Sequence, residues 1–176
     1  MPQLKKHLLA VKAPLKKYVE INRQAKNGRR IRSTMRVYTN PIGETFTVKR
    51  DYSSFNKMRH NETIYSVSIN HDQTEKFASA IIEVHPKKYI SHQDVPEIHI
   101  RDVGIHLFHK DPKQKKGRGV FGMVVDECKQ IGQKEFHTKP YYITLKANVK
   151  ETQKYYENYG FELIPGTINH MRLKIN

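Results

Sequence analysis

The chain has 176 residues, of which 37% are hydrophobic and 28% are charged, and its formal net charge is +15. This composition excludes a largely disordered chain and predicts a single globular domain with a packed core. One cysteine excludes an internal disulfide and a cysteine-rich zinc site, which fits a reducing compartment. The sequence has no apolar run of membrane-spanning length and no secretory signal, so we expect a soluble, cytoplasmic protein.

The positive charge is concentrated in the first third of the chain. Residues 1–60 hold 15 Lys and Arg against three acidic residues, so +12 of the +15 lies there. This asymmetry is typical of proteins that bind nucleic acid, an acidic protein surface or an anionic membrane surface, although a solvated basic face has the same pattern. We predict that the substrate or nucleic acid contacts the arginines that crowd the first strand-like stretch: Arg29, Arg30, Arg32 and Arg36.

The first half of the chain predicts a helical arm followed by strands. Apolar residues in 3–26 recur at helical spacing and Pro14 interrupts them, which predicts two short helices or one kinked helix. We therefore expect a basic, helical extension over residues 1–32, followed by the main body of the domain over 33–176. Residues 35–39 and 45–48 predict a hairpin, and residues 63–70, 77–84 and 96–109 predict a meander of antiparallel strands.

The second half alternates helices and strands. A helix is predicted from residue 120 to about 133, a strand at 141–147, a helix at about 149–159, and closing strands near 161–164 and 171–175. A strand, a crossover helix and a parallel strand form a right-handed unit, so the sheet is expected to be mixed. The predicted fold class is α/β (α+β), with a mixed, mostly antiparallel, twisted sheet and flanking helices.

Residues 114–119 form a glycine-containing turn at the start of a predicted helix. Gly117 and Gly119 lie two residues apart among Lys115, Lys116 and Arg118, so backbone N–H groups can converge on an anion without obstruction by side chains. The stretch lacks the ending of a nucleotide-hydrolysing phosphate loop and the glycine spacing of a dinucleotide site. It therefore predicts an anion site of another kind.

Gln114, Gly117 and Gly119 resemble the Gln/Arg-x-x-Gly-x-Gly/Ala motif of the GNAT superfamily of N-acetyltransferases. About forty residues downstream, residues 155–162 (Tyr-Tyr-Glu-Asn-Tyr-Gly-Phe-Glu) resemble the family's aromatic-Tyr-Glu-x-hydrophobic-Gly-Phe sequence at the end of the fourth helix. The resemblance covers roughly residues 62–176. It implies a single-domain GNAT fold with a V-shaped splay between the fourth and fifth strands, here those predicted at 96–109 and 141–147.

The resemblance also implies acetyl-CoA as the cofactor and assigns residues to it. The pyrophosphate would bind the turn and helix start, and the pantetheine arm would pair with backbone in the splay between the strands. Tyr156 matches the family's tyrosine at the thiol and is the expected general acid, while Asn148 lies one residue from the asparagine often found after the fifth strand. The implied cofactor contacts are Leu107, Phe108, His109, Gln114, Lys115, Lys116, Gly117, Arg118, Gly119 and Asn148.

The resemblance does not fix the general base. Proton acceptors on the strand predicted at 96–109 are Glu97, His99, Asp102 and His106, and Gly104 predicts a bulge that would change which of them share a face. We choose His106, because it lies closest to the expected thioester and an imidazole titrates near neutral pH. No pair of histidines has convincing metal-ligand spacing, so no metal is predicted.

The predicted function is an acetyl-CoA-dependent N-acetyltransferase. The basic first third favours an acceptor amine on a nucleic acid or an acidic partner: an aminoacyl-tRNA, as in toxins of this superfamily, a DNA base or a protein amine. Because the usual first strand and helix pair are not clear, we expect a rebuilt substrate-facing region. The alternative is a non-catalytic nucleic-acid-binding protein on the same scaffold. The acceptor and the oligomeric state stay open.

Overall fold

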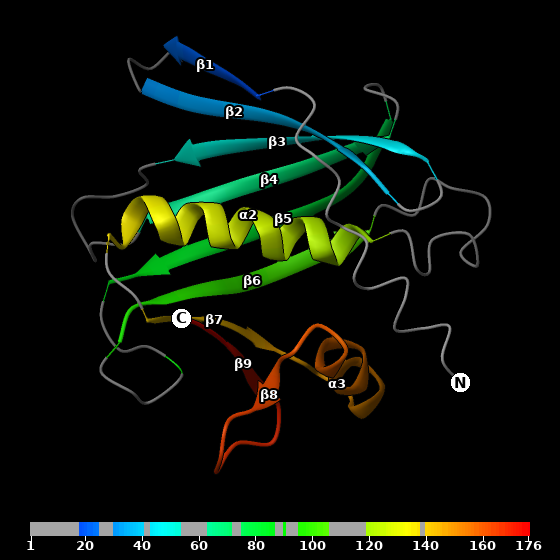
Figure 1. Cartoon of the computed structure of the whole chain (residues 1–176), viewed down its shortest axis with the longest axis vertical. Helices are drawn as coiled ribbons and strands as arrows, with labels where there is room; N and C mark the ends of the chain where they lie inside the picture. The colour runs from blue at the N-terminus through cyan, green and yellow to red at the C-terminus, as the bar shows by residue number, and fades with distance from the viewer. Residues whose placement is uncertain are drawn as a thin grey trace. The chain divides into compact units, whose positions relative to one another are not determined.

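A computed structural model of the chain describes residues 18–24, 30–40, 43–53, 63–71, 75–86, 90, 95–105, 119–137 and 140–176 (Figure 1). Within these ranges the chain forms nine strands and two helices. The strands are β1 (Tyr18–Gln24), β2 (Arg30–Thr39), β3 (Thr45–Ser53), β4 (Thr63–His71), β5 (Glu75–His85), β6 (Glu97–Ile105), β7 (Tyr141–Lys146), β8 (Glu162–Leu163) and β9 (His170–Ile175). The helices are α2 (Val120–Glu135) and α3 (Lys150–Glu157).

The strands form one mixed sheet in the hydrogen-bonded order β1-β2-β3-β4-β5-β6-β7-β9-β8. Pairing is antiparallel for β1 with β2, β2 with β3, β7 with β9 and β8 with β9, whereas β6 and β7 are parallel. The parallel pair brackets α2, as expected for a strand, crossover helix and strand. A mixed α+β fold is therefore confirmed, and it is compatible with the GNAT-like fold that the sequence resembles.

The N-terminal region differs from its predicted structure. Tyr18–Gln24 is a strand that pairs antiparallel with β2, where we predicted a helix. The boundary expected between residues 32 and 33 falls inside β2. Figure 1 shows β1, β2 and β3 side by side. Val19 and Ile21 alternate with Glu20 and Asn22, and β2 supplies the backbone partners that stabilise this alternation as a strand.

The predicted hairpin after β2 is confirmed. The Asn40 N–H donates to the Glu44 carbonyl oxygen at 2.9 Å, and the Asn40 Oδ1 accepts from the Glu44 N–H at 2.8 Å. Gly43 has a φ of 87°, a left-handed conformation that glycine adopts without a Cβ clash. These bonds close the turn and set the β2–β3 register of Arg36 opposite Val48.

The described structure divides into two compact units. The first consists of Met1–Ser53, Tyr65–Ile81 and Asp102–Val124, and the second of Ser54–Ile64, Ile82–Arg101 and Val125–Asn176. In the first unit Phe46 packs edge-on against Phe77, and Tyr52 packs edge-on against Tyr65. Burial of these rings supplies a large apolar area, which is the main favourable contribution to this core.

In the second unit, α2 packs on one face of β7. An added Cβ at Gly132 would lie 2.6 Å from the Tyr141 hydroxyl oxygen, so only glycine lets this ring approach the helix so closely. The same hydroxyl donates to the Lys129 carbonyl oxygen of α2 at 3.2 Å. Ile131, Ile143 and Met171 are fully buried in the core of this unit.

No helix in the described ranges is long and apolar enough to cross a membrane.

Candidate functional site

The helix α2 begins directly after the second glycine of the predicted cofactor motif. Gly119 has a φ of 74°, and its carbonyl oxygen accepts the N–H of Met123 at 3.1 Å, so it is the N-cap residue. The first N–H groups of a helix lack intrahelical acceptors and carry the positive end of the helix dipole. The first turn of α2 has no acidic residue that would offset this potential. The helix start is therefore suited to an anion.

Tyr156 lies in the last turn of α3, within a group of aromatic rings. Its ring centroid is 5.5 Å from that of Tyr155 and 6.2 Å from that of Phe161, and Tyr155 and Tyr159 share a hydrogen bond of 3.2 Å between their hydroxyls. Burial among these rings raises the pKa of the Tyr156 phenol, and Tyr155 adds to the effect. Tyr156 therefore holds its proton at neutral pH, as a hydrogen donor must.

The end of α3 depends on Gly160. This residue has a φ of 86°, and an added Cβ would lie 3.3 Å from the Leu173 side chain on β9. The N–H groups of Tyr159 and Phe161 donate to the Tyr156 carbonyl oxygen at 2.9 Å and 3.3 Å. Since Phe161 is buried, this turn fixes the direction in which the chain leaves Tyr156.

The other predicted site residues lie in different environments. Asn148 is exposed in the connection between β7 and α3. Arg36 is buried on β2, so its side chain is not on an open surface where nucleic acid would reach it. Arg30 and Arg32 lie on β2. Asn148 and Tyr156 belong to the second unit, and Gly119 and Arg36 to the first. Outside the described residues lie Arg29, His106, Leu107, Phe108, His109, Gln114, Lys115, Lys116, Gly117 and Arg118.

The pairing of β6 with β7 is short. It joins Glu97 to Tyr142 at one end and Ile100 to Leu145 at the other, whereas β6 itself continues to Ile105. Arg101 is therefore the first residue of β6 beyond the described pairing. Gly104 lies inside β6, and an added Cβ there would meet only the Ser79 hydroxyl oxygen, at 3.9 Å.

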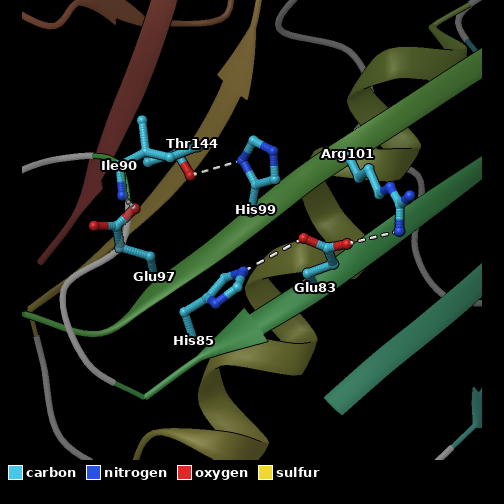
Figure 2. A network of polar contacts seen from close by, with 7 residues as sticks. All are labelled: Glu83, His85, Ile90, Glu97, His99, Arg101 and Thr144. Atoms are coloured by element: carbon cyan, nitrogen blue, oxygen red, sulfur yellow. Dashed lines mark hydrogen bonds and ion pairs between the residues drawn. The ribbon is translucent and has the colours of Figure 1, made fainter. Parts of the chain in front are cut away.

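Glu97, His99 and Arg101 lie on the sheet face opposite α2. The register places Glu97 beside Tyr142 and His99 beside Thr144, so these residues share one face, while the neighbouring Tyr141 points to α2. Figure 2 shows this face, with the polar side chains on the viewer's side of the strands and α2 behind them. A group of polar residues thus crosses β5, β6 and β7 on the face away from the helix.

Glu83 is the centre of this polar group (Figure 2). Its Oε1 accepts from Arg101 Nη1 at 3.1 Å, and its Oε2 lies 3.5 Å from His85 Nε2. The Glu83 side chain is 10% exposed, whereas that of Arg101 is 61% exposed. A buried carboxylate needs such partners, because an isolated charge in the interior is costly.

His99 forms the inner end of the group. Its Nδ1 lies 3.1 Å from the Thr144 hydroxyl oxygen, and its ring centroid is 6.4 Å from that of His85. The pKa of His99 is lowered from 6.5 to about 4, mainly by burial and also by the nearby His85 and His170, while Glu97 and the Thr144 contact oppose the shift. His99 is therefore neutral at physiological pH and can accept or share a hydrogen bond.

Of the four candidate bases, Glu97 and His99 are buried and Asp102 is exposed. Glu97 already accepts the Ile90 N–H at 3.0 Å, which ties the connection before β6 to the strand. His106 lies outside the described residues, so its choice as the base stays a prediction.

Glu83, His85 and Arg101 are not among the site residues predicted from the sequence. The signal was present, because Glu83-Val84-His85 and residues 97–101 (Glu-Ile-His-Ile-Arg) both alternate polar and apolar residues. Alternation places the polar residues of each strand on one face. Only the pairing of these strands brings the two sets together. In the described ranges, no group of three or more His, Cys, Asp or Glu could hold a metal ion.

No protein-family model matches this chain, and no curated protein matches it. Six chains among the solved structures do match. One is a Tyr-to-Phe mutant of the toxin AtaT bound to the C-terminus of the antitoxin AtaR, with a TM-score of 0.43 and 8% sequence identity. The match covers 64% of this chain and 66% of that one, just under two thirds of its length. A likeness this distant carries no argument about activity or partners.

Proposed function

We propose that this protein is an acetyl-CoA-dependent N-acetyltransferase whose acceptor amine is carried by a nucleic acid. The observation that carries the proposal is the start of α2 at Gly119, in a left-handed conformation, as the last residue of the Gln114-x-x-Gly117-x-Gly119 motif. A helix start without side-chain obstruction is a favourable place for a pyrophosphate. The local structure therefore fits the cofactor that the motif implies.

Two further features support the same reaction. The parallel pairing of β6 with β7 ends at Ile100, and β6 continues to Ile105 beyond the end of β7 at Lys146, which leaves β6 backbone with which a pantetheine arm could pair. Tyr156 lies at the end of α3, next to the buried Phe161, in the sequence context that the family resemblance requires. Along the chain, the β6 strand, the Gly119 motif and Tyr156 follow one another in the same order as the corresponding features of the family that the sequence resembles.

In the proposed reaction, acetyl-CoA would supply an acetyl group activated as a thioester. The Tyr156 phenol would donate its hydrogen bond or its proton to the sulfur as the C–S bond breaks. Its raised pKa keeps the phenol protonated across the neutral range, so the donor is present throughout it. The attacking amine must be neutral, and His106 remains our prediction for the group that removes its proton.

Calorimetric titration with acetyl-CoA tests the proposal. Wild-type protein should bind acetyl-CoA, and Gly119→Asp should abolish binding, because it puts a negative charge where the pyrophosphate would lie. Asn tolerates left-handed backbone about as well as Asp, so Gly119→Asn separates the effect of charge from that of conformation. Gly166→Asp is the matched control, since Gly166 also has a positive φ, 80°, in open space.

The enzyme proposal fails if wild-type protein does not bind acetyl-CoA, or if Gly119→Asp binds it as tightly as wild type. Mass spectrometry after incubation with acetyl-CoA and separate pools of tRNA, DNA and lysate proteins would identify the acceptor. A gain of one acetyl group on tRNA or DNA supports the nucleic-acid acceptor, and a gain only on proteins contradicts it. The alternative, a non-catalytic nucleic-acid-binding protein, predicts salt-sensitive binding without affinity for acetyl-CoA.

A further inference from the structure

Arg101 presents an oriented guanidinium group to solvent. Its Nη1 donates to Glu83 Oε1 at 3.1 Å, while 61% of the side chain is exposed. A guanidinium has five N–H donors in a rigid plane, so one edge can be anchored while another remains available for an anion. The anchor is the buried carboxylate of Glu83, whose other oxygen faces His85 (Figure 2).

The position of Arg101 also favours ligand binding. It is the first residue of β6 beyond the described pairing with β7, where two parallel strands cease to be joined. Lys146, the last residue of β7, is exposed and is paired in register with His170 of β9. Continuing the β6–β7 register one residue beyond Ile100 and Leu145 sets Arg101 beside Lys146, so two cationic residues are neighbours on this part of the sheet.

Arg101 and the helix α2 lie on opposite faces of the sheet. Arg101 shares its face with Glu97 and His99, whereas α2 packs against Tyr141 on the other face. An anion bound by Arg101 would therefore lie on the face that carries Glu97 and His99.

We infer that Arg101, oriented by Glu83, binds a backbone phosphate of a nucleic-acid strand on the sheet face opposite α2. The nucleic acid that the proposed function takes as acceptor carrier would supply the phosphate at this face. A planar guanidinium fits a phosphate through two parallel hydrogen bonds. This inference rests on the proposed function in taking that strand to carry the acceptor amine.

Fluorescence anisotropy with a labelled single-stranded oligonucleotide, measured over a series of salt concentrations, tests the inference. Loss of one phosphate contact reduces the slope of log K against log salt by about 0.7 for a single strand. Arg101→Gln should weaken binding and show that reduction in slope. The control is Lys129→Gln, which removes the same charge from an exposed position on α2 and should leave the slope close to that of wild type.

Glu83→Gln gives a sharper test, because it makes the protein more positive by one charge. General electrostatic attraction predicts tighter binding by this variant, whereas an arginine that has lost its anchor predicts weaker binding. Arg101→Lys keeps the charge and removes the planar fork, so it should also bind more weakly than wild type. It keeps the inference testable if Glu83→Gln does not fold, which circular dichroism would show.

Equal slopes for Arg101→Gln and Lys129→Gln, or tighter binding by folded Glu83→Gln, would overturn the inference. So would a loss of acetyl-CoA affinity in Arg101→Gln, because the phosphate would then belong to the cofactor. Absence of oligonucleotide binding by wild-type protein would overturn it too. If the oligonucleotide results are as expected but wild-type protein does not bind acetyl-CoA, the acetyltransferase proposal fails while the phosphate contact stands.

Discussion

The pKa of His99 differs between the folded and the unfolded protein. Burial, followed by the nearby His85, lowers its folded pKa to about 4 from 6.5. Between these values the unfolded chain binds more protons, so the free energy of unfolding falls as the pH falls through this window. Full stability from this residue is present above pH 6.5, and about 3 kcal/mol is lost by pH 4.

Urea titrations of wild type and His99→Asn across this pH range measure the effect. The variant should be less stable than wild type at neutral pH, and its stability should fall less steeply on acidification because the titrating group is gone. Subtracting the two curves removes the contribution of carboxylates common to both proteins. Parallel curves would mean that His99 does not titrate differently in the folded and unfolded states.

Tyr156 is the second residue whose role can be tested, here as the hydrogen-bond or proton donor to the thiolate. Tyr156→Phe keeps the ring against Tyr155 and Phe161 and removes only the hydroxyl. If the phenol assists departure of the thiolate, kcat for an identified acceptor should fall by about 100-fold, with little change in acetyl-CoA affinity. Tyr155→Phe is the matched control in the same aromatic group, and an equal loss in both variants would contradict a specific role for Tyr156.

At the scale of elements, the seating of α2 on β7 depends on the absence of a side chain at Gly132. Alanine has the higher helix propensity by about 1 kcal/mol, but its Cβ would collide with the buried Tyr141 ring. The collision should dominate, because Tyr141 is held both by its core packing and by the Lys129 carbonyl oxygen. We expect Gly132→Ala to destabilise the protein by about 1–3 kcal/mol in urea unfolding.

A double-mutant cycle with Tyr141→Leu shows whether the ring is the cause. In the Leu background the cost of Gly132→Ala should shrink, since the atoms that the new Cβ meets are removed. A cost that stays unchanged in this background would place the strain elsewhere in α2.

The strand β1 shows how an element can be misassigned from its sequence. Apolar residues upstream of it follow a helical spacing, and Val19 and Ile21 continue that pattern, which predicts a helix. The same two residues also fit a period of two, which is the spacing of a strand. The whole of Tyr18–Gln24 pairs with β2, and this pairing decides that the segment is a strand. The partner strand supplies hydrogen bonds to backbone groups that an isolated short strand would leave unpaired.

At the scale of the whole molecule, the uneven charge predicts where a polyanion binds. Replacing Lys5, Lys6, Lys12, Lys16 and Lys17 by Gln should weaken tRNA binding and flatten its salt dependence. The matched control replaces five exposed lysines of the second half by Gln: Lys129, Lys134, Lys150, Lys154 and Lys174. Both variants lose the same charge, so equal effects in anisotropy titrations would contradict a preferred N-terminal binding region.

The sequence by itself determined most of the elements from β2 onward. Alternating residues predicted β4, strand-like runs predicted β5 and β7, helical spacing and glycines predicted α2 and α3, and the order of strand, helix and strand predicted the parallel pair. These features depend on local periodicity and on backbone conformations that particular residues favour, both of which can be read from neighbouring positions. Gly119 and Tyr156 are identified as site residues only through the resemblance of their sequence motifs to those of a known family.

Only the tertiary structure decided that residues 18–24 form a strand and that the chain divides into two units. It also decided that Arg36 is buried and that Glu83 joins Arg101. These properties depend on which strands become neighbours, and that is set by contacts between residues far apart in the sequence. The glycine-rich turn could be recognised from six consecutive residues, whereas the polar face opposite α2 exists only because β5, β6 and β7 lie side by side.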